Sequence, residues 1–104
     1  MIDPSILEQR TEPRYVERVA LQVEGKDVNG QLFVEVVLTE NISRSGACIK
    51  LTRKVMIGQH LQIYTYDGHI TKQAIATSRW AVPDNGHWLV GLSINRPSKI
   101  WPNC

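Results

Sequence analysis

The feature that most restricts how this chain can fold is a set of three dipeptides, Asn29-Gly30, Asp67-Gly68 and Asn85-Gly86. Each lies between runs of residues that favour β-strands. An Asn-Gly or Asp-Gly pair in that setting is a strong signal for a tight hairpin, because both central residues of the turn adopt positive φ. We therefore expect antiparallel strands joined by short turns.

Apolar residues alternate with period two between these turns, as they do along a strand. One such set shares a side of its strand: Leu32, Val34, Val36 and Leu38. We predict six strands, over residues 18–24, 31–40, 46–52, 60–66, 69–82 and 87–95. Short strands at regular spacing are typical of a small sandwich or barrel, and closing a barrel removes exposed sheet edges. The predicted fold class is all-β, a small six-stranded antiparallel β-barrel.

The length of 104 residues suits one domain, in which residues 18–95 form the barrel. Residues 1–17 do not alternate and contain two prolines, so we expect a flexible N-terminal arm. The tail, residues 96–104, also contains two prolines, which leave room for at most a short turn or helix.

Composition argues against several other classes of protein. The formal net charge of +2 is low for a general nucleic-acid binder, so no DNA or RNA partner is expected. No apolar run reaches the length of a membrane span, and the N-terminus lacks a secretory pattern. Cys48 and Cys104 are far apart and form no metal-type spacing with the histidines. These features predict a cytoplasmic protein without a metal or cofactor. No nucleophile–base set or carboxylate pair can be assembled, so we expect a non-enzymatic protein.

Two short motifs carry the candidate site. Arg10 and Arg14 form an RxxxR within the arm. Asn41, Ser43 and Gly46 form an NxSxxG between two predicted strands. Each motif alone is a weak signal, because spaced arginines are common on solvated surfaces and an Asn-x-Ser near a glycine is commonly a plain turn.

Together the two motifs resemble the PilZ domain family, which pairs an RxxxR before its first barrel strand with a [D/N]xSxxG between its second and third strands. The run from Gly86 to Ile94 is similar to the family's last strand, and the resemblance covers roughly residues 9–95. It implies a receptor for the bacterial second messenger cyclic di-GMP that acts on an effector protein in trans. Asn41 stands where Asp is frequent in the family, and it lacks the carboxylate that would pair with an arginine.

The residue types of the motifs suit this ligand, which has two phosphates and two guanines. A guanidinium binds phosphate oxygens, or the O6 and N7 atoms of guanine, through two hydrogen bonds, as expected for Arg10 and Arg14. Asn41 and Ser43 offer an amide and a hydroxyl to the edge of a guanine. Gly46 is expected to adopt a backbone conformation closed to other residues and to let the ligand approach.

Four further residues are secondary candidates for the same ligand. Trp80 has a ring that can stack on a purine, although a tryptophan that covers the barrel rim is more common. Arg18 is expected to be a surface residue or an auxiliary phosphate contact. Arg44, between two serines, is solvated unless it meets the ligand, and Gln9 lies next to the first motif arginine.

Other functions stay open at the level of sequence. The main alternative is a PilZ-type interaction adaptor that does not bind the nucleotide. Another is a small barrel that binds single-stranded nucleic acid through arginines and tryptophans, which the low net charge disfavours. If the chain is a receptor, the expected mechanism is that the ligand orders the arm over Asn41 and Ser43 and creates a surface for the effector.

Overall fold

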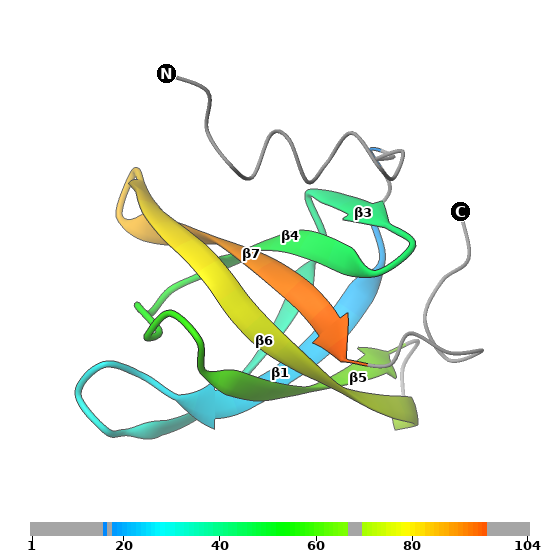
Figure 1. The fold of residues 1–104 in the computed structure, drawn as a ribbon, viewed down its shortest axis with the longest axis horizontal. Coiled ribbons are helices and arrows are strands. Elements are labelled where there is room, and N and C mark those ends of the chain that lie inside the picture. The colour runs from blue at the N-terminus through cyan, green and yellow to red at the C-terminus, as the bar shows by residue number, and fades with distance from the viewer. Residues whose placement is uncertain (1–15, 17, 67–69, 96–104) are drawn as a thin grey trace.

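The computed structural model describes residues 16, 18–66 and 70–95, which form seven strands (Figure 1). No helix among them is long and apolar enough to cross a membrane. The strands are β1 Ala20–Lys26, β2 Leu32–Leu38, β3 Asn41–Ser43, β4 Gly46–Leu51, β5 His60–Tyr66, β6 Ile70–Asp84 and β7 His87–Asn95. The ends of the six predicted strands agree to within two residues. The predicted number is wrong by one, because the NxSxxG segment forms the additional short strand β3.

Two of the predicted turns can be followed in the backbone. Asn85 and Gly86, with φ of 49° and 83°, connect β6 to β7 by the two left-handed residues that a tight hairpin needs. The tight turn predicted at Asn29-Gly30 is wrong: Gly30 has φ of 80°, but Asn29 does not have positive φ, and the connection runs from Asp27 to Gln31. Asp67-Gly68 lies outside the described residues, between strands that pair as an antiparallel hairpin.

The strands form one antiparallel sheet in the order β2-β1-β5-β6-β7-β4-β3. The sheet curls until β2 lies near β4 (Figure 1). No backbone ladder joins the edge strands β2 and β3 within the described part of the chain, so side chains close this seam. Glu35 of β2 accepts hydrogen bonds from the amide, at 3.2 Å, and from the hydroxyl of Thr52, which follows β4. The fold is thus a curled antiparallel half-barrel, which confirms the predicted all-β fold class.

The hydrophobic core lies inside the curl of the sheet. Because successive side chains of a strand point to opposite faces, each strand contributes alternate residues to it. The largest fully buried apolar side chains are Leu21, Val23, Ile42, Ile49, Leu51, Val55, Leu61, Ile63 and Val90. Even the three-residue strand β3 contributes one of these, and this buried residue leaves its two polar neighbours on the outer face.

The alternating apolar residues of strand β2 are exposed to solvent. Leu32, Val34, Val36 and Leu38 are between 52% and 77% exposed. Phe33 and Val37, which alternate with them, are buried or half-buried against the core. Both faces of this strand carry apolar residues, so periodicity predicts the strand but does not predict which face is inside.

Candidate functional site

The NxSxxG motif folds into the β3–β4 hairpin, whose two-residue turn is Arg44-Ser45. Asn41 and Ser43 share one face of β3, and Ile42 between them is fully buried in the core. Ser43 is itself buried and pairs directly with Gly46 across the turn. Because Ile42 points into the core, strand alternation places Asn41 and Ser43 on the opposite face of the sheet, where Asn41 is half-buried and Ser43 is buried.

Gly46 is needed for space and not for positive φ. The glycines with positive φ in the described segments are Gly30, Gly58 and Gly86, so the expected special backbone conformation at Gly46 is wrong. A β-carbon built on Gly46 would lie 2.6 Å from the carbonyl oxygen of Leu92 on β7. Because that oxygen belongs to the backbone, a side chain at this position would force β4 and β7 apart.

A row of cross-strand neighbours extends the motif over the outer face of the sheet. Asn41 pairs with Cys48, Cys48 with Gly91, and Gly91 with Trp80. Directly opposed residues of antiparallel strands project from the same face. A β-carbon on Gly91 would lie 2.2 Å from Nε1 of the Trp80 indole. The missing side chain of Gly91 therefore makes room for the ring, which extends from β6 across β7 toward the motif.

Sequence reasoning missed Gly91, although a glycine inside an apolar strand is a known sign of close approach. It also missed Arg79, which is exposed at the irregularity in the β6–β7 pairing just before Trp80. Arg44 is exposed at the hairpin turn, and neither arginine has an ion pair among the described residues. Two cationic side chains thus lie at the edges of the outer face.

Arg18 lies beside the motif and is paired. Its Nη1 atom is 3.4 Å from Oε2 of Glu40, the residue before Asn41. The amide of Thr39 donates to the carbonyl of Val19 at 3.0 Å, and the Thr39 hydroxyl accepts from the Val19 amide at 2.9 Å. The chain that follows RxxxR therefore enters the sheet beside the chain that leads into NxSxxG.

Gln9, Arg10 and Arg14 lie outside the described residues, so their contribution to the site stays a prediction.

Comparison with protein families gives a match to the PilZ domain model over residues 8–100. The chain belongs to the PilZ domain family. PilZ domains are cyclic di-GMP receptors, interact with effector proteins and are generally non-enzymatic. The matched segment includes both the RxxxR and the NxSxxG motif of this PilZ domain.

Among solved structures, this PilZ domain is similar to Bacillus subtilis Inhibitor of motility (MotI/DgrA), with a TM-score of 0.64. The two chains are 17% identical, and the likeness covers 86% of this chain and 44% of that one. At this identity the likeness shows the fold alone, and the chain spans less than half the length of that protein. No curated protein matches the sequence.

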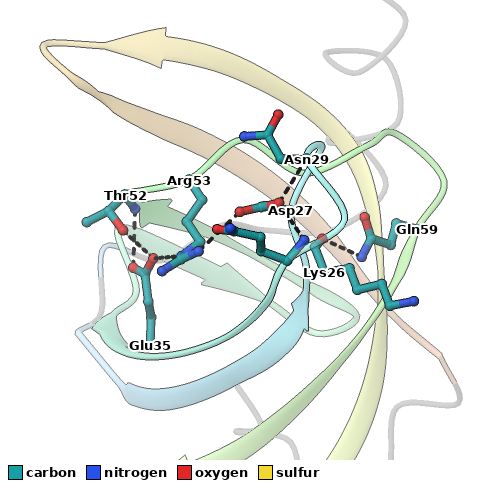
Figure 2. Close-up of polar contacts among 8 residues, drawn as sticks. Lys26, Asp27, Asn29, Glu35, Thr52, Arg53 and Gln59 are labelled. Atoms are coloured by element: carbon teal, nitrogen blue, oxygen red, sulfur yellow. Dashed lines mark hydrogen bonds and ion pairs between the residues drawn. The ribbon is translucent and has the colours of Figure 1, made fainter.

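The opposite end of β4 leads into a polar network (Figure 2). Asp27 is buried, and its Oδ1 atom accepts from the amides of Asn29 and Gln31 at 2.9 and 3.0 Å. Its Oδ2 atom accepts from Arg53 Nη1 at 3.1 Å, and Arg53 Nε lies 3.6 Å from Glu35. Hydrogen bonds from Gln31, Asn29 and Arg53 hold the pKa of Asp27 below its usual 3.8, although burial acts in the other direction. Within this network the two carboxylates of Asp27 and Glu35 share the one guanidinium of Arg53.

Metal ligation has no support in the part of the chain that the structure describes, where no three His, Cys, Asp or Glu side chains gather. On the outer face, Lys50 Nζ lies 3.0 Å from Asp84 Oδ2. This ion pair raises the pKa of Lys50. It bridges β4 to the end of β6 and lies outside the network around Asp27.

Proposed function

We propose that this PilZ domain is a cyclic di-GMP receptor whose ligand lies on the outer face of β3, β4 and β7. The observation that carries the proposal is the contact of Arg18 and Val19 with Thr39 and Glu40. It brings the chain that follows one motif beside the chain that precedes the other. This contact supports a single site formed by two motifs that are about thirty residues apart in sequence.

Chain length limits where the arm arginines can be. Arg14 lies four residues before Arg18, and a fully extended chain of that length spans at most about 14 Å. Arg18 is itself 3.4 Å from Glu40, next to the motif residue Asn41. This tether supports a place for the guanidinium of Arg14 within reach of the outer face. Arg10 is tethered by four more residues and has a wider range.

Each group on this face suits a part of the ligand. The forked guanidinium groups of Arg10 and Arg14 match phosphate oxygens and the O6 and N7 atoms of guanine. Asn41 is half-buried and offers its amide to a guanine edge. The Trp80 ring gives a base a surface to stack on.

Ser43 has a different setting, because it is only 3% exposed. We propose that it mainly fixes the hairpin, and that its hydroxyl meets the ligand only if the surface above it opens. The hairpin turn is tied to β7 through the amide of Ile94, which donates to the carbonyl of Ser45 at 2.6 Å. Ligand contacts at Asn41 would thus act on a frame that is already rigid.

Calorimetry with cyclic di-GMP tests the receptor function, with GTP and cyclic GMP as controls. We expect saturable heat with cyclic di-GMP alone, and an affinity that falls with added salt because the contacts are charge-assisted. Concentrated protein that gives no heat with excess ligand would refute the proposal. The interaction adaptor that binds no nucleotide would then be the better account.

Signal relay follows from ordering of the arm. Amides in residues 8–17 should exchange with solvent more slowly once the ligand is bound, while the core strands change little. Ordering costs about 1–2 kcal/mol per residue, so the affinity should be modest. Equal protection of the arm with and without ligand would mean that the site is preformed and that the signal is not relayed by ordering of the arm.

A further inference from the structure

A groove of about 450 Å³ opens at the end of the sheet away from the β3–β4 hairpin. Its lining residues belong to the end of β1, to the β1–β2 connection and to the loop that follows β4. Both loops are at the left of the molecule in Figure 1. Three apolar side chains line it, Val28, Met56 and Ile57, and these are between 42% and 62% exposed. Gly30 and Gly58, with φ of 80° and 85°, leave the rim open, because no atom lies near where their β-carbons would be. Loop tips normally carry polar residues, so three exposed apolar residues around one hollow need a reason.

Hydrogen bonds hold the walls of the groove in place. The side chain of Gln59 donates to the carbonyl of Lys26 at 2.7 Å (Figure 2). It also accepts from the Met56 amide at 3.3 Å. The amide of Val28 donates to the carbonyl of Lys54 at 3.0 Å and joins the turn to the loop. A surface fixed in this way loses little conformational entropy when a partner binds. The exposed apolar residues are therefore presented by a rigid frame.

Two exposed lysines give this part of the surface positive charge. Lys26 lines the groove, and Lys54 lines the hollow beside it, on the other side of Asp27 and Val28. Neither lysine has a carboxylate partner in the described part of the chain. The Lys54 ammonium lies 4.9 Å from the centre of the Trp88 ring, a contact that leaves its charge uncompensated. The neighbouring carboxylate of Asp27 is already bound by Arg53 and two amides. The surface thus offers an apolar hollow beside two unpaired positive charges.

We propose that this groove docks an acidic amphipathic segment of a partner protein, with one large apolar side chain in the hollow and carboxylates beside Lys26 and Lys54. A concave site with an apolar centre and a charged rim suits a side chain that inserts. An anionic bilayer would also attract lysines and apolar residues, but it favours residues that protrude over residues that line a hollow. The groove and the NxSxxG hairpin lie at opposite ends of β4, so this surface is separate from the proposed nucleotide site.

A library of random short peptides displayed on phage, selected against the full chain, is the probe for this surface. Selected peptides should share a large apolar residue flanked by Asp or Glu. Ile57→Asp should weaken their binding roughly tenfold or more, since truncation of a central contact commonly costs this much. Lys26→Glu should weaken it less and should remove most of its salt dependence. Val34→Asp is the matched control, because Val34 is 61% exposed and Ile57 59%, and it should bind normally.

Three outcomes would overturn the proposal: no enriched sequence, enriched peptides that bind Ile57→Asp as tightly as wild type, or enrichment of basic peptides. Vesicles of phosphatidylcholine and phosphatidylserine in equal parts form a parallel arm. Binding to vesicles that Ile57→Asp abolishes, without any peptide binding, would assign the groove to a membrane surface. Cyclic di-GMP affinity measured on the same variants should be unchanged, so that failure here is distinct from failure of the receptor function.

Discussion

The two ends of strand β4 treat their charged residues in opposite ways. After its last residue, Arg53 is bound to Asp27 and Glu35, and the resulting cluster ties the β1–β2 turn to the closing seam. Before its first residue, Arg44 is exposed in the hairpin turn without an ion pair among the described residues. Strand β4 thus leads from an arginine that is held by two carboxylates to an arginine that has no such partner among the described residues.

This difference separates residues that hold the fold from residues that are available to a ligand. A charge compensated by its neighbours would have to give up those contacts to bind a nucleotide. An exposed arginine without an ion pair has no such cost. The comparison therefore predicts that substitutions at the Asp27 end change stability alone, whereas substitutions at the motif end change cyclic di-GMP affinity.

The largest loss of stability is expected for Asp27→Ala. The substitution removes the acceptor of two backbone amides and of Arg53, and it leaves the guanidinium beside Glu35 alone. Thermal unfolding should show a fall of several degrees in melting temperature. Affinity for cyclic di-GMP, corrected for the folded fraction, should stay at the wild-type value. A variant that melts normally would mean that the network does not hold the seam.

Acid should act through the same carboxylate. Because the pKa of Asp27 is lowered in the folded state, its ionised form contributes stability at pH values above 3.8, the ordinary value. That contribution should disappear as the pH falls below 3.8 toward the folded pKa. The free energy of unfolding, measured with denaturant, should therefore fall less between neutral and acid pH for Asp27→Asn than for wild type. An equal fall in both proteins would show that Asp27 does not cause the loss of stability in acid.

Gly46→Ala should affect both stability and binding. The new methyl group would meet the Leu92 carbonyl on β7, and such overpacking costs about 1–3 kcal/mol. Gly25→Ala is the matched control, because its β-carbon would also be crowded, by the Leu61 side chain at the other end of the sheet. The control should lower stability without a change in affinity. Equal loss of affinity in both variants would show that binding only follows stability.

Arg14→Ala should change binding alone. Loss of one bidentate contact costs about 1–3 kcal/mol, which is roughly a five- to 150-fold loss of affinity. Arg14→Lys should bind nearly as weakly, because an ammonium keeps the charge but not the fork. Calorimetry gives the affinities, and the melting temperature without ligand should not move. A lysine variant with full affinity would reduce the role of Arg14 to its charge.

The smallest effect is expected for Trp80→Ala. Stacking of one base on an aromatic ring is worth about 1–3 kcal/mol, and at the lower limit this predicts about a fivefold loss of affinity. Trp80→Phe should recover most of the loss, because a flat ring remains. If Trp80→Phe restores the melting temperature but not the affinity, the Trp80 ring packs over Gly91 and does not contact the ligand.

Local patterns predicted most of the fold. Turn dipeptides and alternation gave the six long strands, because hairpin geometry depends on neighbouring residues. Strand β3 was missed because a strand of three residues has one buried side chain, Ile42, as its only signal. The face of β2 that points into the core could not be predicted, because Phe33 on the inner face and Val34 on the exposed face are both apolar.

The candidate site was only partly accessible to the same reasoning. The motif residues Asn41 and Gly46 were found from their spacing, but the reason for Gly46 depends on the approach of β7. The place of Trp80 over Gly91, and the pairing of Arg18 with Glu40, depend on strands that meet only in the folded sheet. A single sequence does not show which strands become neighbours, so Gly91 could signal a close approach but could not identify Trp80 as the side chain that fills the space.

Nuclear magnetic resonance of the labelled full chain, titrated with cyclic di-GMP, tests the central claim most directly. The account predicts shifts of the amide signals in residues 41–46 and 91–93 and in the RxxxR segment. Signals of residues 27–31 and 52–59, at the other end of β4, should hold their positions. Shifts that concentrate at the Asp27 end, or no shifts with excess ligand, would contradict the assignment of the motif end as the cyclic di-GMP site.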